Sequence, residues 1–240
     1  MLRLYILLSV LLTLAGCDAL NIKRSVAEDD VRLTKHIGVV SMLGDTFYGV
    51  SIGMTAFNNE YFSAPVPDWK INEYATIKAL EALKLNNKFQ ADALDISGLD
   101  SNQINLKNDS LLWDRAKLQG FEKLVVIHAG VSDNMRFFKP GYGFYQRSLL
   151  FRNPSRCVYA GYAITVFDVS TRRSVGWEWG GGQMPCQFNS SNDIVFKNEF
   201  SEYSEDEKLI FRKRLEARIS ESIPATLEEL SLIPAGTSSK

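Results

Sequence analysis

The chain has 240 residues, 45% of them hydrophobic, and its 27 Lys and Arg nearly balance its 28 Asp and Glu. This length suits one sizeable domain, and the near-neutral charge argues against nucleic acid as a partner, which would require a strongly basic face. The two histidines, His36 and His128, do not stand at metal-ligand spacing from any cysteine. We therefore expect no metal site and no cofactor.

The first seventeen residues have the layout of a secretory signal. Arg3 precedes an apolar run from Leu4 to Leu14, which is too short to cross a bilayer as a helix. The segment ends in Leu14-Ala15-Gly16-Cys17 and resembles the signal of bacterial lipoproteins. The resemblance implies cleavage after residue 16 and acylation of Cys17, palmitate being one such group. The alternative is an ordinary signal peptide with an incidental cysteine.

These features predict four segments along the chain. Residues 1–16 form a lipoprotein signal peptide, 17–35 the lipidated cysteine and a tether, 36–232 an α/β domain, and 233–240 a disordered tail. The protein is expected in the cell envelope, facing the periplasm. Asp18 resembles the signal that retains lipoproteins in the inner membrane, so we favour that membrane slightly over the outer one.

The first half of the domain predicts a β-hairpin, two helices and two strands. Residues 37–53 alternate around Gly44-Asp45, a type II′ turn sequence. Asp68 is a candidate cap for a helix that extends to Leu83. Residues 89–96 form the next strand, and a helix from Asp109 to Gly120 precedes the buried strand 124–127.

The second half predicts another hairpin and a long helix. Residues 158–169 and 174–180 alternate on either side of a turn at 170–173. Ser204 and Glu207 form a capping box before a helix that Pro224 should kink or shorten. The expected fold is a single α/β (α+β) domain, with a mixed sheet that contains two hairpins and is flanked by three helices.

Two cysteines remain after lipidation, Cys157 and Cys186, and an even number in an oxidising compartment predicts a disulfide. If the second hairpin is centred between Thr171 and Arg172, the two cysteines face each other across the ladder. A bulge near Gly180-Gly181-Gly182 or at Pro185 would break that register. Two buried free thiols are the alternative.

Two further segments could carry function. Ser51 lies in a G-x-S-x-G pattern, and Asp92 or Asp95 and then His128 follow in the order of a hydrolase triad, but Ser51 is not at the strand-to-helix turn that this chemistry needs. Residues 132–156 mix aromatic and basic side chains, with Asp133 as the only acid. This segment is either a loop that binds a protein, anionic lipid or acidic glycan, or a core strand. Its candidate partner-binding residues are Arg136, Phe138, Tyr142, Phe144, Tyr145 and Arg147.

The order of elements also resembles a known domain. A helix and buried strand over 113–127 precede a strand ending in Thr165-Val166-Phe167-Asp168 and then Val175-Gly176-Trp177. This order looks like the α/β domain shared by the amino-terminal part of the Tol translocation protein, the curli secretion lipoprotein and lipoprotein activators of penicillin-binding proteins. Uncharacterised proteobacterial lipoproteins also open with a similar Ile-Gly-Val-Val and Gly-Asp hairpin.

The resemblance implies a non-enzymatic domain that binds an envelope protein partner. We therefore expect a membrane-anchored binding or scaffolding module without catalytic residues. A hydrolase that uses Ser51 and His128 is one alternative, and a lipid- or glycan-binding module that uses residues 132–156 is another.

Overall fold

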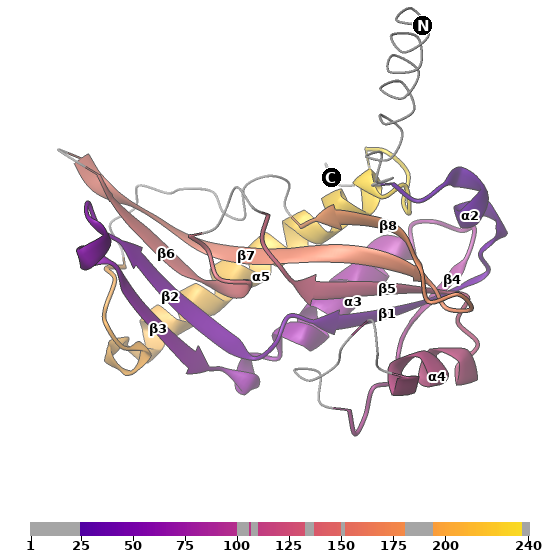
Figure 1. Cartoon of the computed structure of the whole chain (residues 1–240), viewed down its shortest axis with the longest axis horizontal. Helices are drawn as coiled ribbons and strands as arrows, with labels where there is room; N and C mark the ends of the chain where they lie inside the picture. Colours follow the sequence, from indigo (N-terminus) through magenta and orange to yellow (C-terminus); the bar gives the residue numbers. More distant parts are fainter. Residues whose placement is uncertain are drawn as a thin grey trace, which may run out of the picture.

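The structure is a computed structural model that describes residues 25–99, 106, 110–132, 137–149, 152–180 and 194–236. Eight strands form one mixed sheet, which confirms the predicted α/β class with a single domain (Figure 1). The elements, in chain order, are α2 (Glu28–Leu33), β1 (His36–Met42), β2 (Thr46–Ile52), η2 (Ala56–Asn58), β3 (Glu60–Pro65), η3 (Pro67–Trp69), α3 (Ile71–Leu83), β4 (Gln90–Ala93), α4 (Ser110–Leu118), β5 (Lys123–Ala129), β6 (Gly141–Leu149), β7 (Arg152–Asp168), β8 (Ser174–Trp179), η5 (Phe200–Glu202) and α5 (Glu205–Glu229).

The first predicted hairpin is wrong, because β1 and β2 do not pair with each other. β1 pairs in parallel with β4 and β5, whereas β2 pairs in parallel with β6 and antiparallel with β3. Gly44 adopts a left-handed φ of 80°, and the Asn72 side chain accepts hydrogen bonds from Leu43 N at 2.7 Å and Ser41 Oγ at 3.1 Å. The Gly44-Asp45 segment is therefore a bend, held by α3, after which the chain continues in the same direction.

The long strand β7 divides the sheet into two halves. Its first part pairs with β6, and its second part pairs with β5 on one edge and β8 on the other. We call β1, β4, β5, β8 and the second part of β7 the proximal half, because α2 lies there. The distal half consists of β2, β3, β6 and the first part of β7, and it lies on the left of Figure 1.

The first face of the sheet is covered by α3 and α5 along both halves (Figure 1). One apolar stripe of α5 is fully buried there, at Phe211, Leu215, Ile219, Ile223 and Leu227. The capping box of Ser204 and Glu207 is also confirmed. Pro224 does not shorten the helix, which continues to Glu229. At the start of α3, Lys70 in a left-handed conformation occupies the cap position instead of Asp68.

The second face is covered differently in the two halves. Over the proximal half, α4 packs Leu112, Trp113 and Ala116 against Val40 and Val126, among others. Over the distal half the buried residues form a separate cluster of Val50, Ile52, Phe138, Tyr145, Cys157 and Tyr159. Within the described ranges no helix packs on this cluster.

The domain boundaries differ from those predicted. Val26 and Val31 are 4% and 5% exposed and belong to the main core, and Val26 N donates to Leu230 O at 3.1 Å. Residues 25–35 are thus part of the domain and not of a tether, and α2 is a fourth helix among the described residues. At the other end Ile233 is also buried. No helix in the described part of the chain is long and apolar enough to span a membrane.

Candidate functional site

The residues of the predicted hydrolase are not brought together. His128 on β5 is paired with Met42, and Ser51 on β2 lies nine residues beyond Met42, a separation of about 30 Å along the chain. His128 Nε2 lies 3.0 Å from Thr165 Oγ1, and burial lowers the pKa of its imidazole. Asp92 is bound to His36 at 2.9 Å. These side chains cannot act on one substrate atom.

The observed register of β7 and β8 does not support the predicted pairing of Cys157 with Cys186. Ala163 pairs with Trp179 and Thr165 with Trp177, which is one residue away from the register that would place Cys157 opposite Cys186. The ladder is therefore not centred between Thr171 and Arg172 as the turn sequence suggested. Cys157 is buried on β7 opposite Tyr145. Cys157 is disulfide-bonded. Cys186, its predicted partner, lies outside the described residues, as does Cys17, so the pairing of Cys157 with Cys186 and the lipidation stay predictions.

Residues 141–149 form β6, a strand between β2 and β7, which is the alternative that the sequence left open. Four aromatic members of the candidate partner-binding set are core residues, with exposures of 8% or less, namely Phe138, Tyr142, Phe144 and Tyr145. Arg136 lies outside the described residues. Among the described members of the set only Arg147 is exposed. Of the predicted partner-binding residues that the structure describes, Arg147 is therefore the one that a partner could contact.

The second face of the distal half nevertheless presents aromatic and basic side chains. We call the exposed residues Tyr61, Phe137, Lys139 and Arg147 the distal face. Tyr61 pairs with Val50 and Arg147 with Ile52, so both side chains stand on the side of the sheet where these two core residues lie. Tyr61 is 53% exposed and Phe137 is 45% exposed.

The distal face is held by a well-packed layer beneath it. The Phe138 ring stacks on Tyr145 at 4.3 Å and meets Tyr159 edge-on at 5.1 Å, which fixes the neighbouring Phe137 and Lys139 over the sheet. Lys139 Nζ lies 5.5 Å from the centre of the Tyr61 ring, a cation–π contact. Gly143 allows β6 to approach β2, because a Cβ there would lie 2.0 Å from the Tyr48 carbonyl oxygen.

The distal face is also basic. The sequence has no Asp or Glu between residues 134 and 167, and both ionisable cations of the distal face, Lys139 and Arg147, are exposed. The nearby Glu60 belongs to the other face. It pairs with Ser51, which also pairs with Gln146, and Gln146 points to the opposite face from its neighbour Arg147. An anionic or aromatic partner therefore meets complementary chemistry on the distal face.

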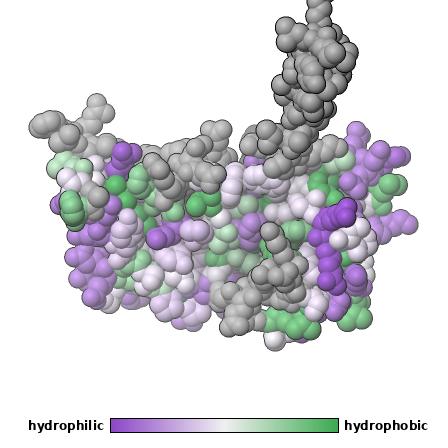
Figure 2. All heavy atoms as spheres, in the orientation of Figure 1, coloured by the Kyte–Doolittle hydropathy of each residue, from purple (hydrophilic) through white to green (hydrophobic). Residues whose placement is uncertain are grey.

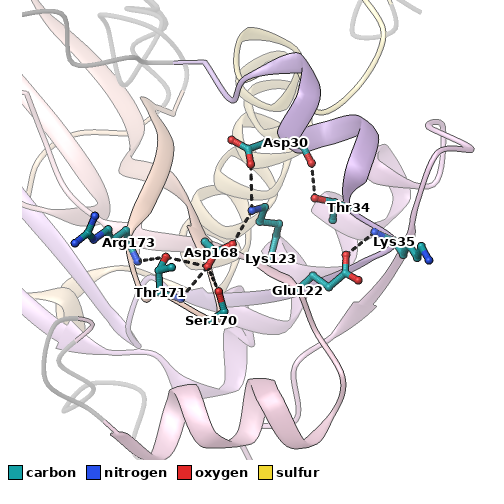
Figure 3. A network of polar contacts seen from close by, with 9 residues as sticks. All are labelled: Asp30, Thr34, Lys35, Glu122, Lys123, Asp168, Ser170, Thr171 and Arg173. Atoms are coloured by element: carbon teal, nitrogen blue, oxygen red, sulfur yellow. Dashed lines mark hydrogen bonds and ion pairs between the residues drawn. The ribbon is translucent and has the colours of Figure 1, made fainter.

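A second polar site lies at the opposite end of the molecule and joins α2 to the sheet (Figure 3). Lys123 at the start of β5 is 8% exposed, and its Nζ donates to Asp168 at 2.8 Å and contacts Asp30 at 3.4 Å. Asp168 also accepts from Ser170 Oγ and from the Thr171 backbone N–H. We call Asp30, Lys123 and Asp168 the anchor-side cluster.

The charges of the anchor-side cluster stabilise each other. Burial alone would raise the pKa of Asp168, but the hydrogen bonds from Lys123 and from Ser170 and Thr171 hold it far below its ordinary value. Burial likewise opposes the charge of Lys123, whereas Asp168 and Asp30 raise its pKa above the usual value.

The sequence places Asp30 in a tether, because an acidic run is typical of solvated chain, and this prediction is wrong. Asp30 lies on α2, where it contacts the ammonium group of Lys123. The neighbouring Val31 is the one signal in the sequence that indicates a docked helix, since it is an apolar residue within an acidic run.

Metal binding is not indicated by the side chains that the structure describes. Within those ranges no three His, Cys, Asp or Glu residues are grouped in a way that could hold a metal ion. The two carboxylates of the anchor-side cluster are already neutralised in part by the ammonium group of Lys123.

No protein-family model matches the chain, and no curated protein matches it. Among solved structures, a PelC dodecamer from Paraburkholderia phytofirmans is similar at 10% identity with a TM-score of 0.34, covering 83% of this chain and 88% of that one. Protein XCC0632 from Xanthomonas campestris, of the family DUF330, is similar at 8% identity with a TM-score of 0.37, covering 88% of this chain and 95% of that one. The likeness to either protein is too weak to carry an argument, and the resemblance to the Tol and curli domains stays a prediction.

Proposed function

We propose that this chain is a lipid-anchored, periplasm-facing protein of the cell envelope that works as a non-catalytic binding or scaffolding module. The observation that carries the proposal is the difference between the two halves of the sheet. The second face of the proximal half is buried under α4, whereas that of the distal half exposes Tyr61, Phe137, Lys139 and Arg147 over a packed aromatic layer.

The distal face has the composition of a protein-binding surface. Aromatic residues and arginine contribute most of the binding energy at interfaces, and they do so best when they are held rigidly. Phe138 and Tyr145 supply such support from below. The partner is an envelope protein with an acidic and apolar surface, because Lys139 and Arg147 are the charges that it meets.

The anchor keeps this surface near its membrane. From Cys17 to Val26 the chain has nine steps, which span at most about 30 Å when fully extended. Hydrogen bonds and buried valines then join the chain to the domain at α2. A membrane-bound partner within that reach is met at a high effective concentration.

The proposal is tested by photo-crosslinking in cells from single sites on the distal face. A photoreactive residue at position 61 or 147 should capture the same envelope protein, and the exposed Lys213 on α5 supplies the control position. Arg147→Glu should abolish capture from position 61. Capture that is equal at position 213, or that survives Arg147→Glu, would contradict the distal face as the binding surface.

The anchor is tested separately by mass spectrometry of the mature protein. The expected chain begins at Cys17 and carries the added mass of acyl groups. A mature chain that starts elsewhere, or that carries no lipid, would remove the envelope anchor from the proposal and leave the distal face to be judged by crosslinking alone.

A further inference from the structure

The connection between β2 and β3 projects two apolar side chains into solvent. Phe57 is 100% exposed and Met54 is 66% exposed, and both belong to the turn around η2. Figure 2 shows hydrophobic residues at the left end of the molecule, where η2 lies in Figure 1. We call Met54 and Phe57 the distal tip.

The distal tip is held in place by polar contacts and not by apolar packing. Asn58 N donates to Thr55 O at 3.0 Å, and Thr55 Oγ1 donates to Asn58 Oδ1 at 2.6 Å. Gly53 N donates to Asn59 Oδ1 at 3.1 Å. The turn is therefore closed on itself, and it holds the Phe57 ring outward before any partner binds.

Basic side chains stand beside the distal tip. Arg147 pairs with Ile52, two residues before Met54, and Lys139 contacts Tyr61, four residues after Phe57. Glu60, the acid that precedes Tyr61 on β3, points to the other face of the sheet. Apolar side chains that protrude beside cations suit the interface of an anionic phospholipid membrane, where rings enter the headgroup region and Lys or Arg bind its phosphates.

We propose that the distal tip inserts Phe57 and Met54 into the headgroup region of an anionic phospholipid membrane, the same membrane that holds the acylated Cys17. The inference rests on the proposed anchor but not on the protein partner. It gives the domain two attachments, one at each end of its sheet, so that its long axis lies along the membrane surface.

The dimensions of the domain permit this arrangement. From the start of β1 to the end of β2 the strands extend about 55 Å, and the segment from Cys17 to Val26 allows about 30 Å more. Two apolar side chains bind a membrane weakly by themselves. A protein that is already anchored presents its distal tip at millimolar effective concentration, where a weak contact is occupied.

The test is photo-crosslinking to lipid in vesicles of phosphatidylethanolamine and phosphatidylglycerol. The acylated full-length mature protein is reconstituted with a photoreactive residue at position 57, or at position 118 as the matched control. Leu118 on α4 is 86% exposed, so both substitutions are made at the surface. Lipid adducts are then counted by mass spectrometry, which also confirms the acyl groups in each sample.

The expected result is at least about a tenfold excess of lipid adducts at position 57 over position 118. Arg147→Gln should lower the yield at position 57 about fivefold, because each basic residue near an anionic surface contributes about that factor. Vesicles of phosphatidylcholine alone should lower the yield further, because they also remove the contribution of Lys139. Equal yields at the two positions, or crosslinked dimers in place of lipid adducts, would overturn the inference. Since the acyl mass is read in the same sample, that failure is distinct from a missing anchor.

Discussion

The two halves of the sheet share a continuous strand, β7, yet they are stabilised in different ways. In the proximal half α4 buries Trp113 on the second face, and the anchor-side cluster fastens α2 to the ends of β5 and β7. In the distal half a thin layer around Phe138 and Tyr145 lies on that same face, beneath exposed aromatic and basic groups. The half next to the proposed membrane anchor is thus enclosed on both faces, and the half farther away presents a surface.

This difference separates stability from binding along one molecule. Residues that the proximal half buries should govern folding, and exposed residues of the distal half should govern recognition with little effect on the free energy of unfolding. Substitutions on the two halves can break or sharpen that distinction.

The largest expected effect is at Trp113, which is fully buried between α4 and the proximal half. Trp113→Ala should lower the free energy of unfolding by about 4 kcal/mol, because it leaves a large cavity. Leu118→Ala on the same helix should change it by less than about 0.5 kcal/mol, because Leu118 is exposed. Urea denaturation measures both, and equal effects would show that α4 is not packed as described.

The next effect is at Asp168 in the anchor-side cluster. Asp168→Asn leaves the buried ammonium of Lys123 with only the longer contact to Asp30, and it should cost about 3 kcal/mol. Asp29→Asn, which removes an exposed ion pair with Arg32 on the same helix, should cost less than about 0.5 kcal/mol.

In acid, the stability of the wild-type protein and that of Asp168→Asn should depend differently on pH. Because folding lowers the pKa of Asp168, its contribution is fully present above the unfolded value of about 4 and is lost as pH falls through the folded pKa. As the pH falls below about 4, the free energy of unfolding, measured in urea, should therefore decrease more for the wild-type protein than for Asp168→Asn. Parallel curves would mean that the carboxylate is not held as the structure shows.

Local signals predicted most of the elements. Alternation and caps located β5, β7, β8, α4 and α5, because each of these depends on its own residues. The pairing of β1 and β2 with more distant strands was not predictable from the turn sequence. The Gly44-Asp45 pair suits a hairpin, but residues distant in the sequence, Asn72 on α3 and Tyr142 on β6, hold it as a bend.

The functional residues were predicted less well, for a related reason. An aromatic and basic run looks the same whether its rings face a partner or a core, and pairing of β6 with β2 and β7 buried Tyr142, Phe144 and Tyr145. Arg147 stayed outside because it stands at the end of the strand, past the packed layer. Tyr61 lies in a segment that carried no functional signal in the sequence, and it joins the distal face only through the pairing of β3 with β2.

A smaller loss of stability is expected at Tyr145, beneath the distal face. Tyr145→Ala removes a ring that is 3% exposed and stacks on Phe138, and it should cost about 2 kcal/mol. Tyr145→Phe keeps the stacked ring and should therefore cost less than Tyr145→Ala. A loss of crosslinking with intact stability in Tyr145→Phe would instead assign the hydroxyl to the partner.

The smallest effect on stability, and the sharpest test of the comparison, is expected at Arg147. Its side chain is exposed at the end of β6, so Arg147→Ala should change the free energy of unfolding by less than about 0.5 kcal/mol. Capture of the envelope protein from position 61 should nevertheless fall strongly, because arginine is among the interface residues whose truncation costs most. Both quantities are measured on one variant, by urea denaturation and by crosslinking. If stability falls and capture does not, the distal half is a second structural core, and the binding surface of this protein lies elsewhere.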